Sequence, residues 1–336
     1  MLQLARMLEI DAICACANDF GAISAAYVAE QLGLGGHDGY DTSLLIHHKD
    51  LFKKYALSVG IPTPFAQGSE TPEKAYQLAM SLQLPLIIKP VDLTGGKGIT
   101  TVNDSGQLQA AIDLAFSISR VGRIVIEEYF HGSQHSFSTF LVNQRVVFHF
   151  SDNEYSYKNP YLVSTSSAPA SNIDSFREEL LQVANTIASS LDLVDGLLHF
   201  QYLASEDEFT ILEITRRCSG DLYPLPVNCS SGLNWTDWII QAESGADCSD
   251  FPLVEQSGYC GRHCIMAPGN GKLKDIVIDE SLKPNITEKY SWWKSGDVID
   301  NYLVQKFGVL LLEFASLSEM QEKTANIHEL VKVELA

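Results

Sequence analysis

The chain of 336 residues lacks a hydrophobic run long enough to cross a membrane. A transmembrane helix needs about 20 predominantly apolar residues, and no stretch approaches that length. The first ten residues, MLQLARMLEI, are interrupted by Gln3, Arg6 and Glu9, which is not the pattern of a signal peptide. Because 46% of the residues are hydrophobic, the chain is typical of a globular protein. We therefore expect a soluble, cytoplasmic protein with no membrane partner.

Positive charge is scarce. The sequence has 23 lysines and arginines against 42 aspartates and glutamates, a formal net charge of -19, and no basic run offsets this excess. Binding to a phosphate backbone requires a basic surface. We therefore expect no nucleic acid partner, whereas a small anion can still bind where a few cations gather.

Paired cysteines are lacking as well. The seven cysteines are an odd number, and the closest pairs, Cys14 with Cys16 and Cys260 with Cys264, have neither a disulfide spacing nor the spacing of a zinc ligand set. This usage is typical of thiols in a reducing compartment.

The common nucleotide-binding motifs are absent. Gly33, Gly35 and Gly36 lack the third glycine of a dinucleotide fingerprint, and no GxxxxGK[ST] loop occurs. The NDFG at residues 18–21 has no HRD loop after it, so it does not indicate a protein kinase.

What the sequence does contain is a hairpin pattern at residues 197–217, LLHFQYLASEDEFTILEITRR. Two alternating segments flank an acidic turn near Asp207, which predicts two antiparallel strands with Gln201 opposite Glu213. One face is expected to carry polar side chains, namely Gln201, Glu213, Thr215 and Arg217, and the other face Phe200, Leu212 and Ile214. Oxygen donors in line with a guanidinium suit Mg²⁺ and a transferring phosphoryl group. The alternative is the solvated face of an ordinary hairpin.

A second informative stretch is LPLIIKPVDLTGGKGITTV, residues 84–102. It predicts a buried strand that ends at Lys89, a glycine loop, and another strand that begins near Ile99. Glycines at this density let backbone amides approach a polyphosphate closely. A glycine-rich hairpin turn is the alternative.

Helices and strands are expected around these two stretches. Residues 1–46 are expected to form helix, strand, helix and strand, and residues 136–150 a hairpin that turns at Asn143 and Gln144. Helices are expected at 47–59, 71–82, 107–119, 176–191, 235–242 and 317–330, and a strand at 123–129 that ends on two glutamates. Residues 151–172 are polar and poorly periodic, which favours a functional loop carrying Tyr155, Tyr157 and Lys158.

Taken in order, HHKDLFKKYALSVGIPTP, LIIKPVDLTGGKGIT, VIEEYFHGSQHS and LLHFQY followed by FTILEITRR resemble the ATP-grasp superfamily over about residues 46–221. The resemblance implies an α/β protein of the α+β ATP-grasp type, in which two subdomains clasp ATP behind a Rossmann-like domain. The implied divisions are a shortened Rossmann-like domain at 1–46, connecting helices at 47–84, a small lid subdomain at 85–132, and a C-terminal subdomain with the metal and phosphoryl site at 133–336.

The resemblance also implies the nucleotide contacts. Lys49 and Lys89 correspond to the cations on the ATP phosphates. The flexible flap corresponds to Gly95, Gly96, Lys97 and Gly98, and Lys97 is as well explained by a solvated loop charge. The adenine contacts correspond to Glu127 and the backbone of Glu128 and Phe130, and the ribose contact to Gln134, where relatives usually have glutamate.

For the metal site the resemblance implies Glu213 as the carboxylate bridging Mg²⁺, with Gln201 and Thr215 as further ligands, and Arg217 as the catalytic arginine. Gln201 and Thr215 are departures, because many relatives have glutamate and most have asparagine at these positions. The N-terminus is another departure, since it begins at what resembles the helix after the family's first strand. A domain without its central strand would expose a sheet edge, which favours a homodimer or a partner chain.

The implied activity is ATP-dependent ligation of a small-molecule carboxylate to an amine through an acyl phosphate, with ATP and Mg²⁺ as cofactors. Three alternatives stay open. They are a bicarbonate-phosphorylating enzyme similar to carbamoyl phosphate synthetase, a small-molecule kinase of the same fold, and a non-catalytic nucleotide-binding partner subunit.

Overall fold

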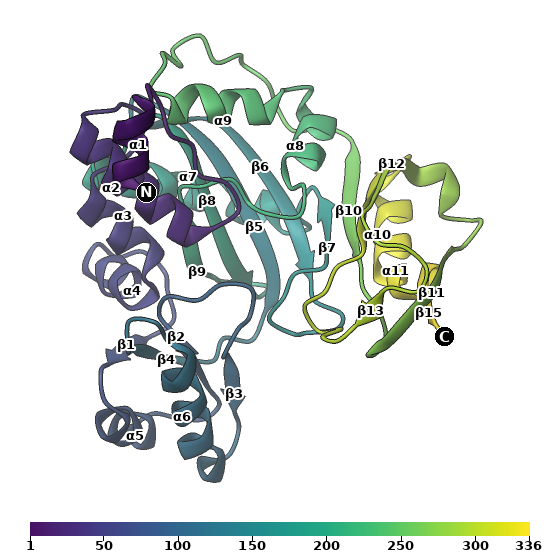
Figure 1. The fold of residues 1–336 in the computed structure, drawn as a ribbon, viewed down its shortest axis with the longest axis horizontal. Helices are drawn as coiled ribbons and strands as arrows, with labels where there is room; N and C mark the ends of the chain where they lie inside the picture. The colour runs from purple at the N-terminus through teal and green to yellow at the C-terminus, as the bar shows by residue number, and fades with distance from the viewer.

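An eight-stranded antiparallel sheet forms the centre of the computed structural model, which describes residues 1–336 (Figure 1). Its strands follow the order β12-β14-β10-β7-β6-β5-β8-β9. Their bounds are Ser133–Val142 (β5), Arg145–Tyr155 (β6), Thr165–Ala168 (β7), Gly196–Ala204 (β8), Phe209–Thr215 (β9), Tyr259–Ile265 (β10), Ile286–Ser291 (β12) and Gly308–Phe314 (β14).

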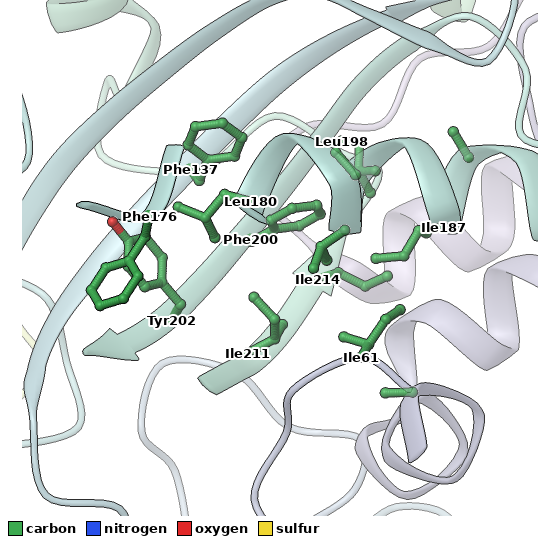
Figure 2. Close-up of a cluster of buried hydrophobic side chains, with 14 of the residues drawn as sticks. Ile61, Phe137, Phe176, Leu180, Ile187, Leu198, Phe200, Tyr202, Ile211 and Ile214 are labelled. Atoms are coloured by element: carbon green, nitrogen blue, oxygen red, sulfur yellow. The ribbon is translucent and has the colours of Figure 1, made fainter. Parts of the chain in front are cut away.

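The two faces of this sheet have different partners because side chains alternate along each strand. On one face Phe137 of β5 and Phe200 of β8 pack against Leu180 of helix α7, Ile173–Ser190 (Figure 2). On the other face Phe140 packs with the helices α8, Pro224–Ser231, and α9, Trp235–Glu243. The rest of this second face carries polar side chains, which line the cleft described below.

A four-stranded sheet with the order β1-β4-β2-β3 lies apart from the central sheet (Figure 1). It consists of Ala66–Ser69 (β1), Leu86–Pro90 (β2), Thr100–Val102 (β3) and Ile124–Glu128 (β4). Leu86 and Ile88 face helices α5, Pro72–Ser81, and α6, Leu108–Ile118, in a small apolar core. Lys89 therefore points to the opposite side, toward the central sheet. Because β1 belongs to this sheet, the sheet begins before residue 85.

The N-terminal prediction of two strands was wrong. The first 46 residues fall largely in the helices α1, Leu2–Leu8, α2, Asp19–Leu32, and α3, Tyr40–His47, and α4, Lys49–Ser58, follows. The expected first strand is only an isolated bridge from Cys16 to Cys218. The expected second strand is helical because Ser43, Ile46 and His47 are buried at helical spacing. The structure therefore does not confirm a Rossmann-like sheet here, and no sheet edge supports the expected dimerisation.

Two hairpin predictions have different outcomes. Asn143 and Gln144 do form the turn of the β5–β6 hairpin, with φ angles of 50° and 61°. The 151–172 segment is not one long loop, because β6 continues to Tyr155 and β7 is an inner strand of the central sheet. Polar residues on both faces of β6 and β7 are buried. The segment therefore lacks the alternation of polar and apolar residues by which an amphipathic strand is predicted.

The C-terminal part combines the end of the central sheet with a three-stranded sheet, β13-β11-β15. These strands are Val298–Ile299 (β13), Gly271–Ile278 (β11) and Val331–Leu335 (β15), and they pack with α10, Leu317–Ala325, and α11, Ile327–Leu330. The helix expected at 317–330 is thus divided at Asn326. None of the helices has both the length and the apolar composition needed to span a bilayer.

Candidate active site

A cleft with a cavity volume of about 360 Å³ lies between the four-stranded sheet and the polar face of the central sheet. Most of the residues that the ATP-grasp resemblance indicates line this cleft: Lys49, Lys89, Gly95, Gly96, Glu127, Glu128, Phe130, Gln134, Gln201, Glu213, Thr215 and Arg217. Lys97 and Gly98 do not line it. The fold thus brings together side chains that lie up to 168 positions apart in the range Lys49–Arg217.

A buried ion pair joins the two central strands of the four-stranded sheet. Lys89 Nζ lies 2.9 Å from Glu127 Oε2, and both side chains are almost inaccessible to solvent. Burial opposes ionisation of Glu127, but the charges of Lys89 and of the nearby Lys53 hold its pKa below the usual value. The other oxygen of Glu127, Oε1, has no hydrogen-bond partner and stays available to a ligand.

A second lysine meets the central sheet. Lys49 is buried at the start of α4, and its Nζ lies 3.1 Å from Glu213 Oε2 and donates a 2.9 Å hydrogen bond to the carbonyl of Leu93. Although burial opposes it, the charge of Glu213 raises the pKa of Lys49, and Lys49 in turn lowers the pKa of Glu213. A lysine and a carboxylate are therefore held in their charged forms at the floor of the cleft.

The predicted pairing of Gln201 with Glu213 is confirmed, but the hairpin contains a β-bulge directly beside it. Tyr202 pairs with Ile211, so Leu212 is the extra residue. Ile211 takes its place in the apolar core with Ile214, whereas Leu212 lines the cleft. The expectation that Leu212 would lie on the core face was therefore wrong, because the bulge changes the alternation.

Arg217 is held at the end of the hairpin by Asp19. Its Nε lies 2.7 Å from Asp19 Oδ1, and Nη1 donates to the carbonyl of Cys218 at 3.3 Å. Burial opposes ionisation of Asp19, but the contact with His47 and the charge of Arg217 hold its pKa well below the usual value. Asp19 thus fixes the guanidinium of Arg217 at the cleft.

The glycine loop between β2 and β3 approaches another loop closely. Gly96 has a φ of 72°, and a Cβ there would lie 2.7 Å from the carbonyl oxygen of Tyr161. Tyr161 itself lines the cleft, and its hydroxyl accepts a 2.9 Å hydrogen bond from the backbone N–H of Thr101. Gly98 packs against Ile118 instead, which explains why it lies outside the lining. Any larger residue at Gly96 would therefore force the glycine loop and the Tyr161 loop apart.

Of the two backbone segments predicted to contact adenine, at Glu128 and Phe130, the first has its N–H already bonded within the protein. The N–H of Glu128 donates a 3.0 Å hydrogen bond to the carbonyl of Phe65, so this amide is not free to bind a base. Phe130 and Gln134 line the cleft as expected. The Nε2 group of Gln134 donates to Glu154 Oε2 at 2.8 Å.

The expected metal ligands are all oxygen donors, and only one of them carries a charge. Gln201, Glu213 and Thr215 offer an amide, a carboxylate and a hydroxyl oxygen, and oxygen ligands are what Mg²⁺ prefers. Nowhere in the molecule do three or more His, Cys, Asp or Glu side chains gather around one metal position. A Mg²⁺ ion at Glu213 therefore needs further oxygens, and the phosphates of a nucleotide would supply them.

Beyond Gln201 the cleft reaches a buried polar cluster that includes Asp152, Glu154, Tyr223 and Arg262. Burial raises the pKa of Glu154 to about 8 and that of Asp152 to about 6, and the neighbouring carboxylate contributes to the shift of Glu154. A cation bound at Glu213 would lower both pKa values again. Arg262 donates to the carbonyls of Gly220 and Asp221, each at 3.0 Å, while its Nε has no partner.

Two residues that bear on the site were not predicted from the sequence: Glu154, which lines the cleft, and Asp19, which holds Arg217. Asp19 lies in the dismissed NDFG segment, and Glu154 lies in the segment expected to be a loop. Phe148, Phe150, Asp152 and Glu154 share one face of β6, which changes from apolar to acidic along the strand, so periodicity gave no signal that β6 continues. Tyr155, Tyr157 and Lys158, which were expected in a functional loop, do not line the cleft. Tyr157 stacks on Tyr155 and donates to the carbonyl of Thr324.

This geometry agrees with a comparison to known families. Residues 48–224 match the family described as carbamoyl-phosphate synthase L chain, ATP binding domain. The chain belongs to this family. At the level of the family this confirms the predicted ATP-grasp superfamily and the prediction of ATP as a ligand.

Curated relatives match part of the chain. The phosphoribosylamine–glycine ligase of Methanococcus vannielii is 27% identical over 191 residues, which cover 50% of this chain and 43% of that protein. The C-terminal section of the carbamoyl phosphate synthase large chain of Aquifex aeolicus is 23% identical over 177 residues, which cover 51% of this chain and 32% of that protein. The chain thus matches less than half the length of these relatives.

Solved ATP-grasp structures match nearly the whole chain. The L-amino acid ligase from Bacillus licheniformis has a TM-score of 0.82 at 20% identity, and the match covers 99% of this chain and 83% of that one. The biotin carboxylase domain of Hydrogenobacter thermophilus 2-oxoglutarate carboxylase, solved as a dimer with MgADP and bicarbonate, has a TM-score of 0.75 at 17% identity and covers 99% and 77%. The predicted ATP-grasp fold is therefore confirmed.

Proposed function

We propose that the chain is an ATP-dependent ligase that joins a small-molecule carboxylate to an amine and releases ADP and phosphate. The observation that carries the proposal is one cleft in which Lys49, Lys89, Glu213 and Arg217 meet Arg262, a buried guanidinium without an ion-pair partner. Phosphoryl transfer requires mainly positioning and neutralisation of charge, and this set of side chains supplies both.

The nucleotide would occupy the part of the cleft next to the four-stranded sheet. Lys89 and Lys49 supply positive charge for the phosphates, and Gly95 and Gly96 let backbone amides come close to them. Gln201, Glu213 and Thr215 would hold Mg²⁺, which neutralises charge on the transferring phosphoryl group when it is bound. We propose that residues 85–132, together with β1 and α5 of the same sheet and core, form a lid over this nucleotide.

The carboxylate substrate would bind near Arg262. A buried guanidinium is costly unless an anion accompanies it, and Arg262 donates hydrogen bonds to two backbone carbonyls and lies 5.6 Å from the ring centre of Tyr223, with no ion pair. Its unpartnered Nε and planar shape suit a carboxylate or bicarbonate. Arg217 lines the same cleft and would stabilise the charge that develops during transfer.

In the first step a carboxylate oxygen attacks the γ-phosphorus, the bond to the β-phosphate oxygen breaks, and ADP leaves. In the second step the amine nitrogen attacks the acyl carbon, phosphate leaves with the former carboxylate oxygen, and the nitrogen loses a proton. The residues of the chain position these groups and neutralise their charge.

Phosphate release screened over amino acids, hydroxy acids and bicarbonate, with and without amines, tests the proposal. We expect release that depends on a carboxylate and an amine together, and its loss in Glu213→Ala. Retained turnover in that variant would refute the assignment. Arg262→Met should raise the KM for the carboxylate far more than the KM for ATP.

Bicarbonate is the second candidate substrate. Gln201 and Arg262 line the same cleft, and this pair also suits an enzyme that phosphorylates bicarbonate for carboxylation or carbamoylation. ADP release with bicarbonate alone would favour it. A stable phosphorylated product without any amine would indicate a kinase, and binding of ATP without turnover would indicate a non-catalytic partner subunit.

We also propose that the chain works as a homodimer or with a partner chain, which light scattering of the purified protein would test.

A further inference from the structure

Glu154 connects two glutamines of the cleft across three strands. Its Oε2 atom accepts a hydrogen bond of 2.8 Å from Nε2 of Gln134 and another of 2.8 Å from Nε2 of Gln201. Glu154 is buried near the end of β6, with only 8% of its surface exposed. His135 pairs with Asn153 and Ser136 with Gln201, so the three side chains lie on the same face of neighbouring strands.

These hydrogen bonds decide which way the amide of Gln201 points. A primary amide has a donor end and an acceptor end, and the donor end of Gln201 is bound to Glu154. The amide oxygen must therefore point away from Glu154. Gln201 pairs directly with Glu213 on its other side, and side chains paired in this way have Cβ atoms about 4.5–5.5 Å apart. The oxygen of Gln201 and the carboxylate of Glu213 can then share one cation.

A bound cation would favour the ionised form of Glu154, and Glu154 would then also add negative charge near the site. Gln201 and Thr215 are neutral, so Glu213 is the one anionic side chain in the proposed ligand set, and Lys49 already lies 3.1 Å from it. Glu154 adds a carboxylate directly behind Gln201. Outer partners that orient metal ligands in this way typically change metal affinity by about 10–100-fold.

We propose that Glu154 is a positioning residue of the Mg²⁺ site, which aims the oxygen of Gln201 at the metal and places a second carboxyl group behind it. This inference rests on the proposed nucleotide and Mg²⁺ site. It does not require turnover, so its test uses binding alone.

The test measures binding of Mn²⁺ in the presence of ADP from the loss of the free-ion signal in electron paramagnetic resonance. Glu154→Met removes both the acceptor and the charge, and we expect Mn²⁺ to bind about 10–100-fold more weakly. Glu154→Gln keeps an acceptor oxygen but loses the charge, so its affinity should lie between those of Glu154→Met and the unchanged protein. Glu206→Gln, in the exposed turn of the hairpin, is the control for loss of one acidic residue and should bind normally.

The exchange of the two side chains is the decisive variant. In Glu154→Gln with Gln201→Glu the carboxylate moves to β8 and the amide to β6, so charge and hydrogen bonding are both kept. We expect this double variant to bind Mn²⁺ within about threefold of the unchanged protein, because the effect of a positioning partner depends on its charge and contacts. A merely structural role of Glu154 would show as a loss of thermal stability in Glu154→Met that accompanies the loss of Mn²⁺ affinity. Thermal unfolding and binding of a fluorescent ADP without metal establish that each variant is folded.

Three outcomes would overturn the proposal: normal Mn²⁺ affinity in Glu154→Met, a double variant as weak as Glu154→Met, or no Mn²⁺ binding by the unchanged protein with ADP. Failure of the ligase proposal looks different. A protein that shows the predicted Mn²⁺ pattern but releases no phosphate with any carboxylate and amine would refute the ligase reaction and support the role of Glu154.

Discussion

Lys53 is a buried cation whose replacement tests the electrostatics of the cleft directly. Its side chain on α4 is fully buried, and its Nζ donates a 2.8 Å hydrogen bond to the carbonyl of Ile211 in the bulge. The hydroxyl of Thr63 donates to the same carbonyl at 3.1 Å. Replacing Lys53 by methionine would therefore remove a buried charge without leaving this carbonyl unpaired.

The size of the effect follows from the pKa of Lys53. Burial lowers this pKa from 10.5 to about 7, although the carboxylate of Glu127 acts in the opposite direction. The difference corresponds to about 5 kcal/mol, since one pH unit is worth about 1.4 kcal/mol. Below pH 7 the folded protein must keep a charged ammonium here, so the full cost opposes folding. Between pH 7 and 10.5 the unfolded chain binds the extra proton, so stability rises with pH across this window.

We expect Lys53→Met to raise the free energy of unfolding by about 2–4 kcal/mol at pH 6, after about 1 kcal/mol is deducted for the lost hydrogen bond. For a chain of this size that is roughly 3–6 °C in the unfolding midpoint. The advantage should largely disappear by about pH 10, because the lysine of the unfolded chain is then also close to losing its proton, and deprotonation in the folded state costs little.

Thermal unfolding followed by intrinsic fluorescence at several pH values measures the difference between variant and parent. Lys54→Met, at the exposed neighbouring position, is the matched control and should show no such dependence on pH. A Lys53→Met protein that melts below the parent at pH 6, or a difference that is the same at pH 6 and pH 10, would refute the reasoning.

Further predictions concern the ion pair, the bulge and a turn. Glu127→Gln leaves the buried ammonium of Lys89 without its partner, so the free energy of unfolding in a urea titration should fall by about 3–5 kcal/mol; an unchanged value would contradict the buried pair. Ile211→Ala should cost about 2–5 kcal/mol of stability, whereas Leu212→Ala should change stability by less than about 1 kcal/mol and weaken binding of a fluorescent ATP analogue. Equal losses of stability would argue against the bulge. Gln144→Gly relieves a φ of 61° and should raise stability by about 0.5–1 kcal/mol, and a lower melting temperature would disprove the strain.

Local patterns identified the hairpin and the strand ends because each is encoded by neighbouring residues. Strict alternation predicted that Gln201 lies opposite Glu213, and the glycine density predicted the loop after Lys89. The same rule failed at Leu212, since a bulge depends on contacts with Pro62 and Thr63 from elsewhere in the chain. The sequence patterns also failed for the two expected N-terminal strands. The first makes only one isolated bridge, and the second is a short apolar run, which suits a helix and a strand equally.

The sequence by itself determined the ATP-grasp family, the two lysines, the glycine loop and the carboxylate Glu213. Only the tertiary structure decided which charges compensate one another, because ion pairs such as Arg217 with Asp19 join residues almost 200 positions apart. It also decided that Glu154 stands behind Gln201 and that Arg262 has no acidic partner. Sequence spacing carries no information on such contacts, since they depend on how strands are ordered in the central sheet.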